Sequence, residues 1–179
     1  LKDDIIANES EIVSINYLTN DVIELKIDTK KDLDYTSWQF MNFAFSDSKW
    51  DFSRSYSIAN KEWNILTFLI KITELGRWWK VLKKLKNWDK LYYNMISWKF
   101  TLKDTKVSKV FIATGTGLAP IYSMLLNTPE NLAKKLYFWV AKESDLFYLE
   151  NLAKIKNLEI KIYLSKEEIK WYNFGRVNL

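Results

Sequence analysis

The chain has 179 residues, enough for one large domain or two small ones, and its hydrophobic content of 48% is that of a globular protein. The net charge of +5 comes from lysines spread along the sequence, which disfavours a nucleic-acid groove and leaves an acidic partner open. The absence of Cys and His excludes disulfides, thiol nucleophiles, Ser-His-Asp triads, ordinary zinc sites and Cys-ligated iron–sulfur clusters within these residues. We therefore expect no metal site, and any redox chemistry requires an organic cofactor.

Glycine and tryptophan occur in unusual numbers. The chain has four Gly and nine Trp, whereas an average glycine usage of about 7% predicts roughly a dozen glycines. Several tryptophans stand where turns are expected, as Trp63 and Trp88 do. One interpretation is that such codons are UGA, which some bacterial lineages read as glycine. The alternative is a protein rich in exposed tryptophan.

In chain order, the first hundred residues show short β patterns and a single helical one. Strands are predicted over residues 11–18, 21–28, 38–43, 54–60, 64–72, 91–93 and 99–102. A helix is predicted over residues 78–85, and its N-terminus beside Gly76 and Arg77 would suit an anion. Many short strands around one helix are typical of a small antiparallel barrel.

A change of pattern follows the charged stretch 103–106, where we place the domain boundary. Strands are predicted over 109–113, 135–140 and 158–164, with helices over 121–126 and from 144 or 145 to about 156. Strand–helix alternation predicts a parallel sheet with crossover helices. The uncharged run 110–129 is long enough to span a membrane, but its glycines, proline and hydroxyls argue against that. No signal peptide is visible, so we expect no transmembrane segment and a cytoplasmic location.

Two stretches carry candidate chemistry. Alternation along Arg54–Asn60 places Arg54, Tyr56 and Ile58 on one face; an arginine fork suits a phosphate and a flat ring suits a planar heterocycle. Taken alone, an ordinary amphipathic strand explains this stretch better. In Thr114–Pro120 two glycines permit close approach of a ligand to the backbone ahead of a helix, which suits a dinucleotide. A tight strand–helix connection without a ligand is an alternative explanation of that turn. The stretch Thr114–Pro120 lacks the sequence pattern of a nucleoside-triphosphate loop.

The order of the two motifs is more specific than either alone. A barrel with Arg-x-Tyr-Ser followed by an α/β unit with Gly-Thr-Gly-x-Ala-Pro resembles the ferredoxin–NADP reductase superfamily over nearly the whole chain. The resemblance implies a β + α/β fold: an antiparallel six-stranded flavin-binding β-barrel in residues 1–104 and a partial parallel α/β NAD(P)-binding domain in residues 105–179. Family members continue past the position of Leu179, so the chain is expected to be truncated at its C-terminus.

The resemblance also implies individual flavin-binding residues. It assigns Arg54 to the flavin phosphates, Tyr56 to stacking on the isoalloxazine and Ser57 to the flavin N5 edge. Tyr56 and Ser57 are thus the candidate catalytic residues. The other flavin-binding positions that it implies are Gln39 and Phe40 on the adjacent strand and Gly76 and Arg77 in the pyrophosphate turn.

Nucleotide-binding residues are implied in the same way. The matching positions are Thr114, Gly115, Thr116, Gly117, Ala119, Pro120, Lys142, Ser165 and Lys166. Lys142 stands in place of a family arginine, and Ser165-Lys166 resembles the pair that holds the 2′-phosphate in NADPH-preferring members. A lysine can attract a phosphate as a point charge but cannot form the bidentate hydrogen bonds of arginine. An ordinary solvated surface lysine is an equally good interpretation of Lys166.

The function that the resemblance implies is flavin-dependent oxidoreduction. Hydride would pass between NADPH or NADH and N5 of a bound FAD, with FMN as the alternative flavin, and single electrons would pass to ferredoxin, flavodoxin or another redox protein. A reductase subunit of a multicomponent oxygenase or dehydrogenase is the alternative within the family. From another class, a basic barrel with exposed aromatics could be an OB-like binder of single-stranded nucleic acid. Tryptophans stand at positions where the family has glycine: Trp38, Trp88, Trp98, Trp139 and Trp171.

Overall fold

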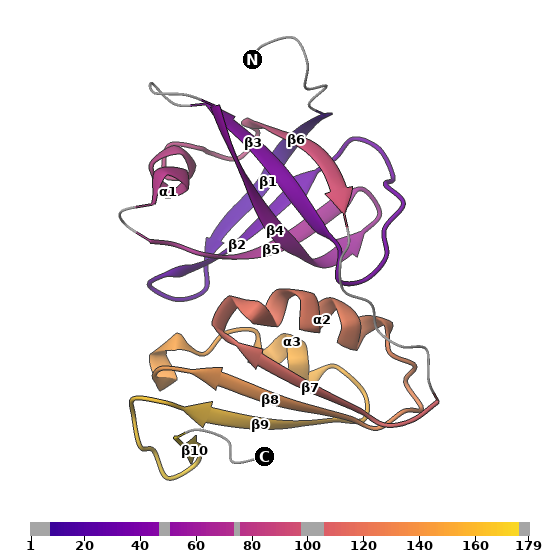
Figure 1. The fold of residues 1–179 in the computed structure, drawn as a ribbon, viewed down its shortest axis with the longest axis vertical. Coiled ribbons are helices and arrows are strands. Elements are labelled where there is room, and N and C mark those ends of the chain that lie inside the picture. Colours follow the sequence, from indigo (N-terminus) through magenta and orange to yellow (C-terminus); the bar gives the residue numbers. More distant parts are fainter. Residues whose placement is uncertain (1–7, 47–50, 74–75, 98–105, 176–179) are drawn as a thin grey trace.

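The computed structural model describes residues 8–46, 51–73, 76–97 and 106–175, and it shows a β-barrel stacked on an α/β sheet (Figure 1). The barrel strands are β1 (Asn8–Tyr17), β2 (Val22–Asp28), β3 (Phe40–Ser46), β4 (Asp51–Glu62), β5 (Ile65–Lys71) and β6 (Lys90–Ser97). They close in the order β1-β2-β5-β4-β3-β6, and every pairing is antiparallel. The six-stranded antiparallel barrel is therefore confirmed.

Alternation along the strands fills the inside of the barrel. In β2, Ile23, Leu25 and Ile27 are fully buried, and they pack with Phe43 of β3 and Phe68 of β5. The predicted third strand begins later than expected, because Trp38 lies in a turn ahead of β3. The strand predicted over 99–102 lies outside the described residues, as does most of the predicted boundary at 103–106.

One short helix, α1 (Arg77–Leu82), joins β5 to β6 at the side of the barrel (Figure 1). It is shorter than the helix predicted over 78–85. Trp78 and Leu82 are its buried residues, and both belong to the barrel core. With six residues, α1 offers little of the dipole expected of a long helix, so an anion beside it must be held by side chains.

The second half is a parallel sheet, as predicted. Its strands are β7 (Lys109–Thr114), β8 (Lys134–Val140), β9 (Leu158–Leu164) and β10 (Asn173–Phe174), in the order β10-β9-β8-β7. A 3₁₀ turn, η1 (Gly115–Gly117), leads into α2 (Leu118–Asn127). The short strand β10 was not predicted.

The helix expected from residue 144 or 145 to about 156 is wrong in its extent. The structure has a 3₁₀ turn, η2 (Glu143–Asp145), and a separate helix, α3 (Leu149–Ala153). Tyr148 between them has a left-handed backbone with φ of 64°, which a continuous helix cannot contain.

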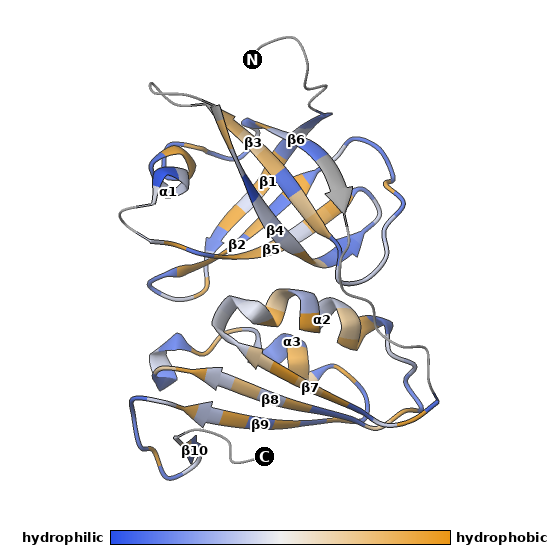
Figure 2. Ribbon diagram, in the orientation of Figure 1, coloured by the Kyte–Doolittle hydropathy of each residue, from blue (hydrophilic) through white to orange (hydrophobic). Residues whose placement is uncertain are grey.

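The barrel and the sheet share a core. Helix α2 lies between them (Figure 1), and apolar residues recur along α2 and the strands β7 to β9 (Figure 2). Val22, Ala59 and Leu69 of the barrel belong to the same buried cluster as Leu118 and Tyr122 of α2. The two halves are therefore held in a fixed relation by burial of apolar surface.

Within the described ranges, α2 included, no helix combines the length and apolar content needed to cross a bilayer.

Candidate cofactor site

Strand β4 carries its motif on two different faces. Arg54 and Tyr56 pair with Phe43 and Met41 of β3, so they share the face that continues into the barrel core. The neighbouring Ile58 is buried in that core. The alternation expected along Arg54–Asn60 is present up to Ala59, and the pairing of β4 with β5 shifts register between Ile58 and Asn60.

A cavity of about 210 Å³ opens between β4, the end of β5 and α1. Four of the predicted flavin-binding residues line it: Arg54, Tyr56, Gly76 and Arg77. The other lining residues are Ile70, Lys71, Ile72, Thr73, Trp78, Trp79 and Leu82. We call this the β4–α1 cavity.

Two guanidinium groups converge at the β4–α1 cavity. The guanidinium carbons of Arg54 and Arg77 lie 5.4 Å and 4.4 Å from the ring centroid of Phe52. Nη1 of Arg54 donates to the carbonyl oxygen of Ser53 at 2.7 Å, and within the described residues Arg54 makes no ion pair. A pair of arginines on one aromatic ring is suited to a phosphate or pyrophosphate group.

Tyr56 presents a neutral ring to the same cavity. Burial raises the pKa of Tyr56 to about 12, although the positive charge of Arg54 opposes the shift. The phenol is therefore protonated at any physiological pH and does not act as a base. The centroid of its ring lies 5.8 Å from that of the Trp78 ring, and both residues line the β4–α1 cavity.

Gly76 is required by the turn that precedes α1. Its N–H donates to the carbonyl oxygen of Thr73 at 2.7 Å. A Cβ at Gly76 would lie 2.7 Å from Thr73 Oγ1 and 2.9 Å from that same carbonyl oxygen, both closer than real Cβ contacts. Glycine thus lets the backbone close tightly beside Arg77.

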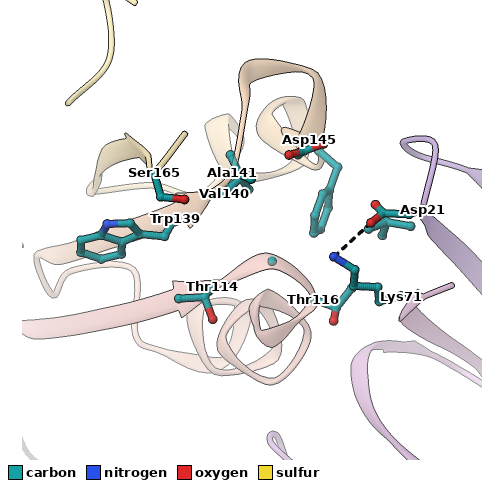
Figure 3. Close-up of a pocket in the computed structure, with 12 residues that line it drawn as sticks. Asp21, Lys71, Thr114, Thr116, Trp139, Val140, Ala141, Asp145 and Ser165 are labelled. Atoms are coloured by element: carbon teal, nitrogen blue, oxygen red, sulfur yellow. Dashed lines mark ion pairs between the residues drawn. The ribbon is translucent and has the colours of Figure 1, made fainter. Parts of the chain in front are cut away.

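A second cavity, of about 460 Å³, lies at the carboxyl ends of β7, β8 and β9, where open parallel sheets bind their ligands. Figure 3 shows the turn around Thr114 and Thr116 between Trp139 and Ser165 on one side and Asp21 and Lys71 on the other. The remaining lining residues are Val22, Gly115, Val140, Ala141, Asp145 and Phe147. We call this the β7–β9 cavity.

The turn after β7 exposes its backbone to the β7–β9 cavity. Gly115 has φ of 47°, and a Cβ built on it would meet no atom within 4 Å. No side chain caps the η1 turn at Thr114, nor α2 at Gly117. The amide groups at this end of α2 can therefore face an anionic ligand.

Lys71 connects the two cavities. It is the last residue of β5 and lines both of them, and its Nζ forms an ion pair with Asp21 at 3.0 Å (Figure 3). The two cavities therefore share one wall. Sequence patterns gave no indication of Lys71 or Asp21, because their place depends on packing of the barrel against the turn after β7.

Three predicted flavin-binding residues line neither cavity. Ser57 and Phe40 face each other as a cross-strand pair. Gln39 accepts the Ile58 N–H at its carbonyl oxygen, 2.9 Å away, and the Thr36 N–H at its side-chain oxygen, 2.7 Å away. These residues hold β3 against β4.

The predicted nucleotide-binding residues divide in a similar way. Thr114, Gly115, Thr116 and Ser165 line the β7–β9 cavity, whereas Gly117, Ala119, Pro120, Lys142 and Lys166 do not. Lys142 and Lys166 are exposed on the loops after β8 and β9, and the Lys166 N–H donates to the carbonyl oxygen of Ala141 at 2.9 Å. Both lysines thus lie near the rim of the cavity.

Trp139 forms one wall of the β7–β9 cavity. Its ring stacks on Tyr163 at 4.5 Å, and Nε1 donates to the carbonyl oxygen of Gly175 at 3.3 Å. Trp139 therefore occupies space at the end of the cavity away from Lys71 (Figure 3).

The residues present fit the two expected cofactors. The β4–α1 cavity combines two arginines, a neutral aromatic ring and a glycine turn, which suits a planar ring system carrying phosphates. The β7–β9 cavity combines uncapped backbone amides with hydroxyls, which suits a dinucleotide. Among the described residues no group of three or more acidic residues is placed to hold a metal ion.

Comparison with known proteins agrees with this geometry. Residues 111–179 match the family described as oxidoreductase NAD-binding domain. The chain is 31% identical over 151 residues to the anthranilate 1,2-dioxygenase electron transfer component of Acinetobacter baylyi, covering 79% of this chain and 43% of that protein. It is 28% identical over 160 residues to one subunit of the Na(+)-translocating NADH-quinone reductase of Shewanella denitrificans, covering 76% of this chain and 39% of that protein. The chain thus spans about two fifths of the length of these relatives.

The fold is also shared with a solved reductase. A ferredoxin–NADP⁺ reductase from Neisseria gonorrhoeae, crystallised with FAD and NADP, superposes with a TM-score of 0.84. The match covers 96% of this chain and 73% of that one, at 18% sequence identity. The chain therefore has the fold of ferredoxin–NADP⁺ reductases, and by sequence its residues 111–179 match an oxidoreductase NAD-binding domain.

Proposed function

We propose that the protein, whose chain has the fold of ferredoxin–NADP reductases, is the flavin- and NAD(P)-binding part of an oxidoreductase. This oxidoreductase would pass electrons to a one-electron carrier. The observation that carries the proposal is the shared wall at Lys71, which places the β4–α1 cavity directly beside the β7–β9 cavity. Reaction between two bound cofactors requires that proximity. We also propose a cytoplasmic location and a division into residues 1–104 and 105–179.

The roles of the barrel residues follow from their chemistry. Arg54 and Arg77 would hold the phosphates of FAD, or of FMN, and Tyr56 would offer its uncharged ring to the isoalloxazine. Ser57, on the opposite face of β4 from Tyr56, is proposed to contact the flavin N5 edge, supported by Gln39 and Phe40. A flavin held by Arg54, Arg77 and Tyr56 would supply hydride transfer with a nicotinamide and one-electron transfer, chemistry that side chains do not provide.

The sheet residues would bind the nucleotide. Thr114, Gly115 and Thr116 present backbone amides and hydroxyls to its phosphates, and Gly117, Ala119 and Pro120 shape the start of α2 behind them. Ser165 lies inside the cavity, while Lys142 and Lys166 at its rim are proposed to attract the phosphate that distinguishes NADPH from NADH. These side chains bind and orient, and no proton-transferring pair is required.

The partner is proposed to be a redox protein such as ferredoxin or flavodoxin. The likeness to an electron transfer component of a dioxygenase supports a second candidate, the reductase component of a multicomponent oxygenase. Both candidates require the same two cofactor sites and differ only in the protein that receives the electrons.

Anaerobic reduction of bound flavin tests the function. The purified chain is loaded with FAD and mixed with NADH or NADPH, and flavin absorbance is followed. We expect bleaching with at least one nucleotide, because the two cavities are adjacent. Absence of bound flavin together with salt-sensitive binding of a single-stranded oligonucleotide would instead support an OB-like nucleic-acid binder.

A further inference from the structure

Three tryptophans have backbone conformations that favour glycine. The φ angles are 72° at Trp38, 58° at Trp63 and 75° at Trp88. In this left-handed region a Cβ crowds the following carbonyl oxygen, so non-glycine residues other than Asn and Asp are uncommon there. The other non-glycine residues with positive φ in the described ranges are Lys30, Tyr148 and Asn157. Tryptophan thus supplies half of this group.

Two of the three tryptophans occupy the same place in the same kind of turn. The Gln39 N–H donates to the carbonyl oxygen of Thr36 at 3.3 Å, which makes Trp38 the third residue of a four-residue turn. Its φ is positive while that of the second residue, Ser37, is not. This combination defines a type II turn, whose third residue is normally glycine.

The turn at Trp88 repeats this geometry. The Asp89 N–H donates to the carbonyl oxygen of Lys86 at 3.2 Å, and Asn87 at the second position lacks a positive φ. In both turns the first N–H is bound by the side chain of the fourth residue, at 2.8 Å here and 2.7 Å in the turn at Trp38. The two turns are therefore well formed, and only the residue at their third position is unusual.

Trp63 lies in a tight hairpin. Glu62 and Ile65 are paired across β4 and β5, which leaves Trp63 and Asn64 as a two-residue loop. Two-residue hairpin loops favour glycine where the first central residue has a positive φ. The third strained tryptophan thus also stands at a position typical of glycine.

The indole rings gain little in return for the strain. Trp63 is 84% exposed and Trp88 is 71% exposed, so neither buries its large apolar surface. Trp38 is partly buried, but its Nε1–H is enclosed without a hydrogen-bond partner. Packing therefore gives no reason for tryptophan at positions 63 and 88, and at position 38 the contact of the indole with the core beside α2 is offset by its unpartnered Nε1–H.

We propose that the polypeptide made in the source cell carries glycine at positions 38, 63 and 88, inserted at UGA codons. The composition supports the same conclusion, because four glycines are too few for a chain with this many turns and nine tryptophans are many. The proposal concerns backbone conformation and does not depend on cofactor binding.

Melting of recombinant chains tests the conformational argument. Trp38, Trp63 and Trp88 are replaced together by glycine in one chain and by alanine in another, so that both lose the indoles and only one keeps the Cβ. We expect the glycine chain to melt higher than the alanine chain by roughly 5–10 °C. Equal melting temperatures, or a higher value for alanine, would overturn the proposal.

Trp79 provides the matched control, because it lies inside α1 and has no positive φ. Trp79→Gly is expected to melt below Trp79→Ala, since glycine in a helix adds backbone entropy to the unfolded state. Tandem mass spectrometry of the chain from its source cells then identifies the residues directly. Glycine in the tryptic peptides 32–49, 62–71 and 87–90 supports the proposal, and tryptophan there, or UGG codons in the gene, refutes it.

Discussion

Arg54 and Arg77 provide the positive charge of the β4–α1 cavity, and both lie against Phe52. We expect Arg54→Gln to weaken binding of FAD roughly 10- to 100-fold, the effect of losing a hydrogen bond to a charged group. Binding of riboflavin, which has no phosphate, should change little. Fluorescence titration with both flavins measures this, with Lys61→Gln as control because Lys61 lines neither cavity. Equal losses for the two flavins would show that Arg54 does not hold the phosphates.

Single residues were predictable where a motif is continuous in sequence. Arg54 and Tyr56 alternate along one strand, and Thr114, Gly115 and Thr116 follow one another, so local geometry carries them to the same cavities. Lys71, Asp21 and Trp78 reach those cavities only through packing between elements distant in the chain, which no local pattern encodes.

At the scale of elements, the turn before α1 depends on Gly76. We expect Gly76→Ala to lower the free energy of unfolding by about 1–3 kcal/mol, because the new Cβ would be forced against Thr73. In Gly117→Ala, by contrast, the nearest atom to the new Cβ is 4.0 Å away and φ is −60°. That variant should be neutral or more stable by about 0.5–1 kcal/mol. Urea denaturation measures both, and similar effects in the two variants would contradict the explanation.

Most strands of both halves could be predicted because apolar side chains recur at every second position along them, as in β2 and β8, whereas the two exposed residues of β10 form too short a pattern. The helix predicted beyond residue 144 could not, since its periodicity continues across Tyr148 while the backbone there turns left-handed. The phenol of Tyr148 donates to Glu24 Oε2 of the barrel at 2.5 Å. The left-handed backbone at Tyr148 thus occurs together with a hydrogen bond between the two halves of the molecule. No sequence pattern in residues 144–156 indicates that bond.

At the scale of the whole molecule, buried phenols make the fold sensitive to alkali. Burial raises the pKa of several tyrosines above their usual value near 10, to about 12 at Tyr56; the others are Tyr35, Tyr93, Tyr122 and Tyr148. Above about pH 10 the unfolded chain therefore releases protons that the folded chain retains, and stability falls as pH rises. We expect equal urea midpoints at about pH 7 and pH 9 and a lower midpoint at about pH 11.

Replacement of one phenol separates this effect from the titration of lysines. Tyr122→Phe should show a smaller loss of stability between about pH 9 and pH 11 than the unmodified chain, because one buried ionisable group is gone. Identical losses in the two chains would mean that buried phenols do not cause the alkaline instability.

We propose above that the strand Arg54–Asn60 forms a flavin site beside a nucleotide site. Flavin content and its anaerobic bleaching by NAD(P)H are therefore compared between Tyr56→Ala and Tyr92→Ala. Tyr92 is the matched control because it lies on β6 and lines neither cavity. We predict that Tyr56→Ala remains folded but loses most of its flavin and the bleaching, while Tyr92→Ala retains both. Unchanged flavin content in folded Tyr56→Ala would mean that this strand does not form a flavin site.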